Sequence, residues 1–412
     1  MHTLKELICE LKALAGRTVR DCTFQKNVEF FGKKEKISIL LPSGDEKYRS
    51  FWVRDAAMMA QSGLVADADL KRYLEIIATH GQNGDKTRHL KNNLCVPPYA
   101  IADHINYDGI PVFFPGCWET EIDQGNGTLG FFPPLCDNYY FILMVEAYVA
   151  QSGDVEILRA DYGGLSLLKR LEYAFEGYQI DAESGLCLSD DAAYTVDWGF
   201  ADTVKKTGKL LMPSLLRYNA ALALSGLQGL IGAYVEKRYS NEAQKIKENI
   251  LSTFLDRDSG WFYSATGIGH QYDVWGTAYA VYSGITQEEQ TLKALYTGYK
   301  NRTAVVNGYV RHILSDRDFS ETSAWESSTT ALGEYQNGAY WATPTGWYAY
   351  ALYRYNLQIE ILDDFLEHTK KHEDRGAPFE WIDADTVQVS GLKYGTSGVL
   401  PYIGIKHILE SK

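Results

Sequence analysis

Most of the sequence after residue 51 has the periodicity of amphipathic helices, in which apolar residues recur every three or four positions. Eleven stretches carry this pattern: 53–63, 67–80, 137–152, 154–176, 212–236, 240–255, 272–283, 287–299, 338–357, 359–372 and 396–410. We expect one more helix in the proline-rich region around 95–106, which brings the count close to twelve. So many helical segments with so few strand signals predict an all-α fold.

Short and long connections alternate between the predicted helices. The long connections are rich in Gly, Asp, Trp and Pro and cover residues 107–136, 181–211, 257–271, 301–337 and 374–395. They are too long for a simple bundle, and long loops on a rigid scaffold usually carry function. About six repeats of helix, short turn, helix and long loop predict an (α/α)6 toroid of six helical hairpins, with the long loops gathered at one mouth.

The first fifty residues have a different character. After an amphipathic stretch, residues 18–41 alternate polar and apolar side chains around a turn at Gly32, which predicts two or three short strands. We therefore assign residues 1–50 to an N-terminal helix and short β lead-in packed on the toroid. Residues 51–412 form the catalytic toroid, because no linker divides them.

Charge and hydropathy exclude two kinds of partner. The chain has 40 Lys and Arg against 53 Asp and Glu, a formal net charge of −13, so no basic surface is available for nucleic acid. No stretch of 18 apolar residues occurs, so we expect no membrane span. The amino-terminal stretch carries acids among its apolar residues. It does not resemble a secretory signal, which predicts a cytoplasmic protein unless a leader was trimmed.

We expect neither a metal ion nor a cofactor. The six cysteines are scattered singly without a CxxC pair and are interpreted as reduced thiols. No HExxH motif and no Gly-rich phosphate or dinucleotide loop is present. Metal-dependent hydrolysis, phosphoryl transfer and dinucleotide chemistry are therefore disfavoured.

Aromatic residues are unusually frequent, at 13% of the chain with 29 Tyr, 16 Phe and 9 Trp. Tyr and Trp combine a flat apolar face with a hydrogen-bonding edge, which suits the two kinds of face of a sugar ring. Carbohydrate is the leading ligand class. The alternative is that Tyr-rich helices pack against each other.

The first candidate cluster is Phe51-Trp52-Val53-Arg54-Asp55, which opens a helix. A guanidinium beside a carboxylate and an aromatic ring can hold neighbouring sugar hydroxyls from the donor and the acceptor side. The alternative is an ion pair at the start of a helix, with Asp55 near the positive end of its dipole.

The second cluster surrounds Asp197, which lies between Val196 and Trp198. Apolar neighbours that desolvate a carboxyl group raise its pKa, as a general acid requires. Asp197 is thus the candidate acid, and Trp198 a candidate sugar contact. Asp202, further along, is interpreted mainly as the cap of the following turn.

The third cluster combines amides and rings at the start of a long apolar helix. Its candidate sugar contacts are Gln336, Asn337, Trp341 and Trp347, and the alternative is that Asn337-Gly338 forms a turn and the two Trp belong to the core. Upstream, Glu326 and Glu334 are two acids that we keep as alternative catalytic groups.

The fourth cluster contains Glu380, an acid between Phe379 and Trp381 in a loop before the last helix. A carboxylate there can activate water, with Trp381 as a further sugar contact, while the alternative is an exposed turn glutamate. A rim loop with Trp118 and Glu119 supplies two more candidate contacts.

Taken in order, the motifs FWVRDAA, VDWGFAD, YQNGAYWATPTGW, FEWIDAD and YGTSG resemble the six-hairpin glycosidase superfamily, which includes glucoamylases, trehalases and processing α-glucosidases. The resemblance spans residues 50–410. It implies that Arg54 and Asp55 grip the terminal sugar, that Asp197 is the general acid and that Glu380 is the base. The order Val-Asp-Trp differs from the small-Trp-Asp order of the superfamily, and the β-sandwich domain that precedes many relatives is missing.

The sequence therefore predicts a glycoside hydrolase that removes a terminal sugar from an oligosaccharide by inversion. Asp197 protonates the leaving oxygen and Glu380 activates water, so their carboxyl groups should lie roughly 6.5–9.5 Å apart. Two alternatives remain: a sugar epimerase or isomerase on a similar toroid, and a carbohydrate-binding protein without catalysis.

Overall fold

The computed structural model describes residues 2–30, 32–114, 130–232, 237–384 and 387–410. Helices dominate these residues, as predicted, and twelve α-helices lie within them. In chain order they are α1 (Leu4–Asp21), α2 (Val53–Ala60), α3 (Asp67–Ile76), α4 (Cys136–Ser152), α5 (Leu167–Glu176), α6 (Leu211–Leu230), α7 (Arg238–Phe254), α8 (Val274–Tyr282), α9 (Glu289–Lys300), α10 (Thr345–Leu352), α11 (Gln358–Lys371) and α12 (Gly395–Glu410).

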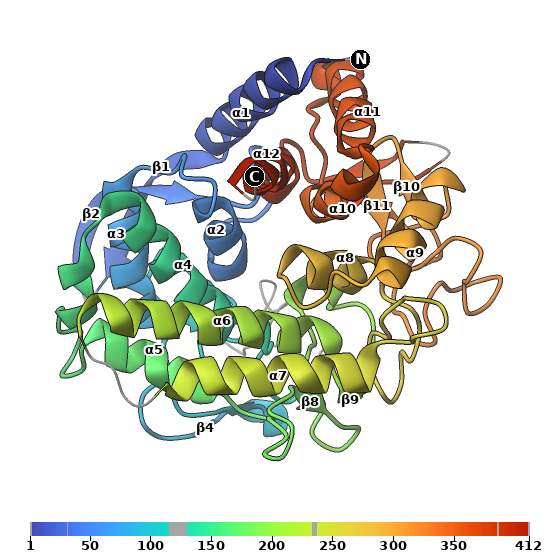
Figure 1. The fold of residues 1–412 in the computed structure, drawn as a ribbon. Coiled ribbons are helices and arrows are strands. Elements are labelled where there is room, and N and C mark those ends of the chain that lie inside the picture. Colours follow the sequence, from blue (N-terminus) through green and yellow to red (C-terminus); the bar gives the residue numbers. More distant parts are fainter. Residues whose placement is uncertain (1, 31, 115–129, 233–236, 385–386, 411–412) are drawn as a thin grey trace.

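The even-numbered helices from α2 to α12 contact one another in sequence, and α12 returns to contact α2 (Figure 1). The other helices pack outside them: α3 on α4, α5 and α7 on α6, α9 on α8 and α10, α11 on α10, and α1 on both α11 and α12. Sequence explains this division. Inner helices such as α4 and α8 are buried on nearly every side, whereas outer helices such as α5 bury only one apolar stripe.

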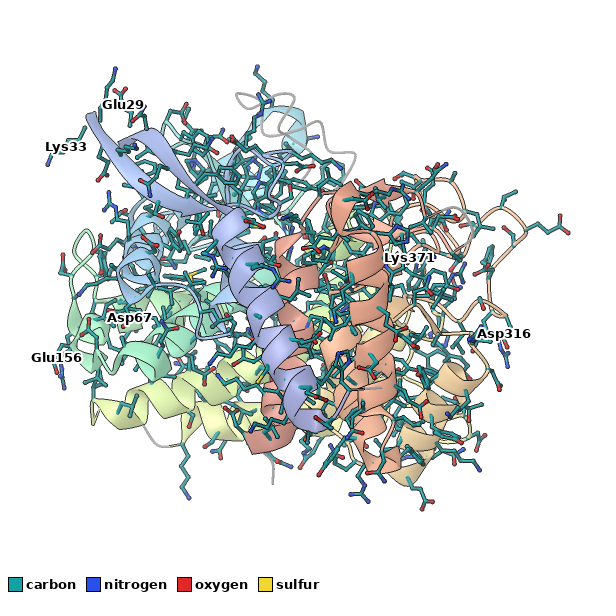
Figure 2. The ribbon with its side chains drawn as sticks, turned by 90° about the horizontal axis from the view of Figure 1, so that it is seen from above. Glu29, Lys33, Asp67, Glu156, Asp316 and Lys371 are labelled. Atoms are coloured by element: carbon teal, nitrogen blue, oxygen red, sulfur yellow. The ribbon has the colours of Figure 1, made fainter. Side chains whose placement is uncertain are left out.

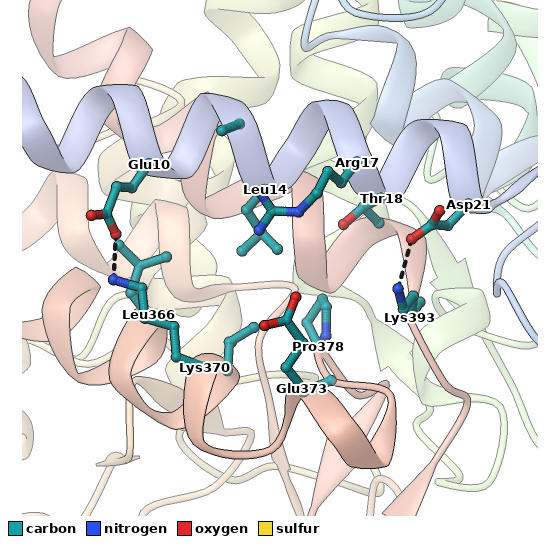
Figure 3. Close-up of a pocket in the computed structure, with 13 residues that line it drawn as sticks. Glu10, Leu14, Arg17, Thr18, Asp21, Leu366, Lys370, Glu373, Pro378 and Lys393 are labelled. Carbon is teal, nitrogen blue, oxygen red and sulfur yellow. Dashed lines mark hydrogen bonds and ion pairs between the residues drawn. The ribbon is translucent and has the colours of Figure 1, made fainter.

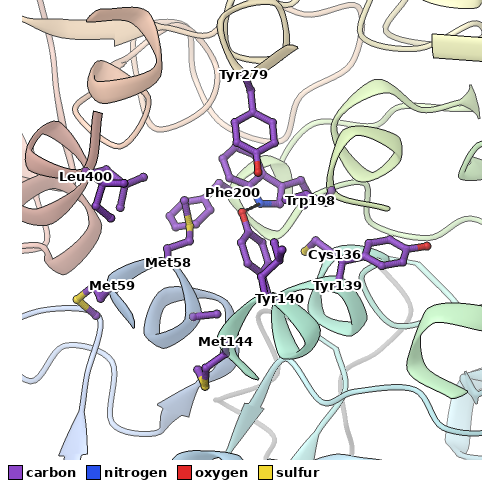
Figure 4. Packing of buried hydrophobic residues seen from close by; sticks show 14 of the residues in the cluster. Met58, Met59, Cys136, Tyr139, Tyr140, Met144, Trp198, Phe200, Tyr279 and Leu400 are labelled. Carbon is purple, nitrogen blue, oxygen red and sulfur yellow. Dashed lines mark hydrogen bonds between the residues drawn. The ribbon is translucent and has the colours of Figure 1, made fainter. Parts of the chain in front are cut away.

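Large side chains fill the space between the inner helices (Figure 4). Trp198, Phe200 and Tyr140 meet there, and the Trp198 indole N–H donates a hydrogen bond to the Tyr140 hydroxyl at 3.2 Å. Met58 from α2 and Tyr279 from α8 lie around them. This packing fills the space between the inner helices.

The lead-in forms the predicted hairpin. Strands β1 (Thr23–Phe30) and β2 (Lys33–Leu40) pair antiparallel, from Thr23 opposite Leu40 to Phe30 opposite Lys33. Its tip, with Glu29 and Lys33, lies at the edge of the molecule, and α1 runs beside the C-terminal helices (Figure 2).

Few strand signals after residue 51 predict no extended sheet beyond the lead-in, and the sheets that the structure has there are built from strands of two or three residues. Five short strands form one sheet in the order β10 (Val305–Val306), β11 (Tyr309–Arg311), β12 (Tyr340–Trp341), β13 (Trp381–Ile382) and β14 (Val389–Ser390). Smaller sheets join β3 (Phe51–Trp52), β6 (His104–Ile105) and β7 (Pro111–Val112); β4 (Arg88–His89) and β5 (Cys95–Val96); and β8 (Leu188–Ser189) and β9 (Gly208–Lys209). Strands of two or three residues are too short to show a two-residue alternation in sequence.

Three helix predictions also need correction. Residues 95–106 contain strands rather than a helix, because prolines 97 and 98 remove backbone donors, and the twelfth helix is α1. The stretch 154–176 is divided into a 3₁₀-helix (Val155–Arg159) and α5. The stretch 338–357 begins with strand β12, so α10 starts only at Thr345.

The long loops contact one another, as predicted. Phe132 bridges to Thr195, Val204 bridges to Ser328, and strands β11 to β14 join residues 309–311 to residues 381–390. Chain segments far apart in sequence are therefore brought together at the end of the inner helices where α2, α4 and α12 begin. None of the described helices is long and apolar enough to cross a membrane.

Candidate active site

Glu380 lies at the inner end of β13, and its carboxyl group is buried, with 1% of the residue exposed. Its backbone N–H donates to the carbonyl oxygens of Ser390 and Gly391, which fixes the start of the strand. The Tyr48 hydroxyl donates to Oε1 at 2.7 Å, and Lys47 Nζ lies 3.9 Å from Oε2. Oε2 has no hydrogen-bond partner among the described residues. Burial raises the pKa of Glu380 to about 7, while Lys47 and Tyr48 oppose the rise.

Asp202 is half-buried and follows the short 3₁₀-helix Gly199–Ala201. The side-chain amide of Gln336 donates to its Oδ1 at 2.8 Å. Burial raises the pKa of Asp202 to about 6, against the opposing effects of Gln336 and Arg54. The apolar neighbours of Asp197 made it the predicted acid, while the sequence around Asp202 indicates mainly a turn cap.

Tyr335 is a second residue that sequence reasoning missed. It is half-buried, and the nearby charges of Asp202 and Glu380 both add to the rise that burial causes in its pKa. Its ring packs at 5.0 Å from that of Trp341, and its backbone is held in the left-handed region at φ 48°. Strained backbone of this kind concentrates at functional sites. The charges of both carboxyl groups therefore act on the Tyr335 phenol.

Asp197 is placed differently from what the sequence predicted. Its buried Oδ2 accepts a hydrogen bond from Lys206 Nζ at 2.7 Å, and Lys206 is equally buried. Lys206 also lies 4.0 Å from Asp273, whose other oxygen is 3.2 Å from His312 Nε2. Burial raises the pKa of Asp197, and the Lys206 charge opposes the rise. The Asp197 carboxylate is committed to a buried ion pair, whereas Asp202 accepts a hydrogen bond from an uncharged amide.

Arg54 is turned toward the protein rather than open to solvent. Its Nη1 lies 3.1 Å from Asp103 and 3.6 Å from Asp137, and its guanidinium stacks over the Phe200 ring at 5.0 Å. A Cβ at Gly199 would approach Nη1 to 1.7 Å, so only glycine fits there. The predicted two-pronged sugar clamp is therefore replaced by an internal ion pair.

Asp55, the neighbour of Arg54 in the chain, is also buried. Its Oδ1 accepts a hydrogen bond from the Tyr394 hydroxyl at 3.0 Å. Burial raises the pKa of Asp55 to about 6, and Arg54 and Tyr394 oppose the rise. Tyr394 also packs on Tyr48, with ring centroids 6.1 Å apart, so Asp55 and Glu380 share one layer of tyrosines.

Several predicted sugar contacts are structural. Trp198, Trp341 and Trp347 are buried core residues. Asn337 is buried as well, and its amide accepts from the Ala324 backbone N–H at 2.8 Å and donates to the Thr330 carbonyl at 2.7 Å.

Of the remaining aromatic candidates, Trp381 is half-buried next to Glu380. Trp52 stacks on His104 at 4.2 Å and meets Tyr48 edge-on at 5.5 Å. Trp118 and Glu119 lie outside the described residues.

The two alternative acids are exposed. Glu326 accepts a hydrogen bond from the Gly269 backbone N–H at 3.0 Å, and Glu334 closes a tight turn with Asn337. Both carboxyl groups are therefore open to solvent, unlike that of Glu380.

The described part of the chain contains no group of three or more His, Cys, Asp or Glu that could hold a metal ion. His368 and His372 do lie one turn apart on α11 with ring centroids 4.7 Å apart, but burial lowers the pKa of His368 to about 4 and no third ligand joins them. Cys9, Cys22, Cys95, Cys136 and Cys187 are free thiols.

A separate hollow of about 190 Å³ lies between α1 and α11 (Figure 3). Its rim is held by the ion pairs of Glu10 with Lys370 and of Asp21 with Lys393. Neither Asp202 nor Glu380 lines this hollow, so it is distinct from the site described above.

Comparison with known proteins places the fold. No protein-family model and no curated protein matches the sequence. Among solved structures, a rhamnosidase from Klebsiella oxytoca with rhamnose bound matches 96% of this chain at 12% identity and a TM-score of 0.59. A GH78 family rhamnosidase of a Bacillus species matches 96% at 14% identity and 0.57. This chain spans 63% and 34% of the lengths of these two proteins.

A GH63 mannosylglycerate hydrolase from Thermus thermophilus, in complex with glucose, matches over nearly its whole length. The alignment covers 95% of this chain and 99% of that one, at 12% identity and a TM-score of 0.55. This chain therefore shares its fold with glycoside hydrolases of the predicted kind.

Proposed function

We propose that this chain is a glycoside hydrolase that removes a terminal sugar from an oligosaccharide or another glycoside with inversion, using Asp202 as the acid and Glu380 as the base. One observation carries the proposal: two carboxyl groups with raised pKa values, 178 positions apart in the sequence, both add through their charges to the raised pKa of the same tyrosine, Tyr335. The shared fold supports it. The proposal keeps the predicted base and moves the acid from Asp197 to Asp202.

The hydrogen bonds assign a role to each oxygen. Oδ1 of Asp202 accepts the Gln336 amide, so the acidic proton is carried by Oδ2 and passes from there to the glycosidic oxygen. Oε1 of Glu380 accepts the Tyr48 hydroxyl, so Oε2, which accepts no hydrogen bond from the described residues and lies 3.9 Å from Lys47 Nζ, takes the proton from water. That water forms the new bond to the anomeric carbon while the leaving oxygen receives the proton from Asp202. Inversion requires a separation of roughly 6.5–9.5 Å between the two carboxyl groups.

The protonation state follows from the two pKa values. The reaction needs Asp202 protonated and Glu380 ionised. The pKa of Asp202 is about 6 and that of Glu380 about 7, so Asp202 loses its proton first and the two groups ionise in the opposite order. The productive form, with ionised Glu380 and protonated Asp202, is therefore the minor of the two singly protonated forms. The profile of kcat/KM against pH is bell-shaped, with limbs near these two values.

The scaffold and the binding surface belong to the same proposal. The closed cycle of contacts among α2, α4, α6, α8, α10 and α12 supports an (α/α)6 toroid, with residues 1–50 packed on it and supplying Lys47 and Tyr48. Asp55, Tyr335 and Trp381 are the side chains we assign to the terminal sugar, because Trp381 follows Glu380 in the chain and the charges at Asp55 and Tyr335 are coupled to that of Glu380.

The test is hydrolysis of a panel of nitrophenyl glycosides and of mannosylglycerate. Rhamnosides and glucosides come first, because rhamnose and glucose are the ligands of two structures that share the fold. Asp202→Asn and Glu380→Gln should each reduce kcat by about 10²–10⁴-fold, while the exposed Glu334→Gln, a matched loss of one carboxylate, should leave it unchanged. Sugar binding without turnover in the wild type would favour the binding-protein alternative instead.

A further inference from the structure

Both the oxygen and the nitrogen of the Gln336 side-chain amide form hydrogen bonds with other groups of the protein. Its Oε1 accepts a hydrogen bond from the Thr203 backbone N–H at 2.9 Å and another from the Thr203 hydroxyl. Its Nε2 donates to Asp202 Oδ1 at 2.8 Å. The residue is 1% exposed, so it is not the sugar contact that the sequence predicted.

The orientation of this amide is dictated by its partners. A backbone N–H can only donate, so the end of Gln336 that faces Thr203 must be the oxygen. The nitrogen, which can only donate, therefore faces Asp202. As a result, Oδ1 of Asp202 must act as an acceptor, and a proton on the Asp202 carboxyl group is directed to Oδ2.

We propose that Gln336 is a positioning residue for the catalytic acid, which directs the transferable proton of Asp202 to Oδ2 and holds that oxygen toward the substrate. This inference rests on the proposed function, because it takes Asp202 as the acid. Gln336 acts through Asp202 and does not touch the sugar itself.

The segment that carries Gln336 also connects the acid to the base. The Gln336 carbonyl accepts from the buried Trp325 indole at 3.1 Å, which fixes the backbone at this point. A few residues later, Tyr340 and Trp341 pair with Ile382 and Trp381, directly after Glu380. The distance between the two catalytic groups is therefore set by one short piece of hydrogen-bonded chain.

The test is Gln336→Met, which keeps the length of the side chain and removes the amide. An N–H donor stabilises the ionised carboxylate, so its loss raises the pKa of Asp202 above about 6. A higher pKa of Asp202 makes the productive protonation state more common, so a fall in kcat reports the lost orientation of the proton instead. We expect kcat to fall at least about tenfold, a part of the 10²–10⁴-fold that general acid assistance contributes. The acidic limb of the pH profile should move upward, because Asp202 has the lower of the two pKa values. Glu334→Gln, on the exposed side of the same turn, is the control and should change neither quantity.

A direct titration keeps the inference independent of turnover. The carboxyl carbon of Asp202 is followed by 13C NMR, with Asp202→Asn to assign the signal, and circular dichroism verifies that each variant is folded. Gln336→Glu is the second variant, since it retains an acceptor toward Thr203 but places a second carboxyl group against Asp202, and it should raise the pKa further. An unchanged Asp202 titration in both variants would overturn the inference, even if kcat falls. If the wild type hydrolyses no glycoside but the titration moves as expected, the contact is established and the proposed function is the part that fails.

Discussion

The hydrogen bond from Tyr48 to Glu380 gives a quantitative prediction for Tyr48→Phe. The phenol donates to Oε1 at 2.7 Å and lowers the pKa of Glu380 from what burial alone would produce. A hydrogen bond to a charged group contributes about 1.5–3 kcal/mol. The pKa of Glu380 is shifted only by the part of this energy by which the bond to the ionised carboxylate is stronger than the bond to the protonated form. A preference of about 1.4 kcal/mol corresponds to one pKa unit. Phe keeps the ring that packs on Trp52 and Tyr394, so the change isolates the hydroxyl.

Two consequences follow for the pH profile. Glu380 carries the higher of the two pKa values, so the alkaline limb of kcat/KM should move up by about one pH unit. The productive protonation state then becomes about tenfold rarer, and the maximum of kcat/KM should fall by the same factor.

The assay is kcat/KM between about pH 4.5 and 9 for both proteins, a range that brackets both limbs. Tyr107→Phe is the matched control, because the Tyr107 hydroxyl has no hydrogen-bond partner among the described residues. An alkaline limb that stays in place or moves down in Tyr48→Phe would refute the reasoning.

Three further predictions concern charge and stability. Asp197→Asn should leave measurable activity with both limbs of the pH profile in place, whereas Asp202→Asn should lose about 10²–10⁴-fold in kcat; the reverse result in the same assay would restore Asp197 as the acid. Lys206→Met should lower the free energy of unfolding by about 3–5 kcal/mol in urea titration, since it leaves the buried Asp197 charge uncompensated, and a loss below about 1 kcal/mol would contradict that view. Glu380→Gln should stabilise the protein at pH 8 by up to about 3 kcal/mol and change little at pH 4. The folded state raises the pKa of this carboxyl from 4.5 to about 7, so the cost of ionising it appears as pH rises through that range; equal gains at both pH values would exclude this cause.

The sequence predicted the helices well because their signal is local. Apolar periodicity located the segments that became α2 to α12, and the hairpin at Gly32 was found from its alternation. The first helix was assigned to the lead-in instead, because only its contacts with α11 and α12 show that it completes the outer layer.

The site was predicted less completely. Glu380 stood out as an acid between aromatic residues, and the structure places it in a buried, tyrosine-lined position. Asp197 and Asp202 are five positions apart, and both belong to the same motif, VDWGFAD. Their contacts distinguish them: Lys206 forms an ion pair with Asp197, and Gln336, which lies 134 positions away, donates a hydrogen bond to Asp202. Local spacing pointed to Asp197 through its apolar neighbours, because a contact between residues 134 positions apart, such as that of Asp202 with Gln336, leaves no trace in local spacing.

The stereochemical course of hydrolysis tests the central claim most directly. Proton NMR of the first minutes of reaction, on a glycoside from the panel that the wild type hydrolyses, identifies which anomer of the sugar is released before mutarotation. An inverting enzyme with Glu380 as its base releases the anomer opposite to that of the substrate, and Glu380→Gln should release no sugar on the same time scale. Release of the same anomer as in the substrate, or undiminished release by Glu380→Gln, would contradict it.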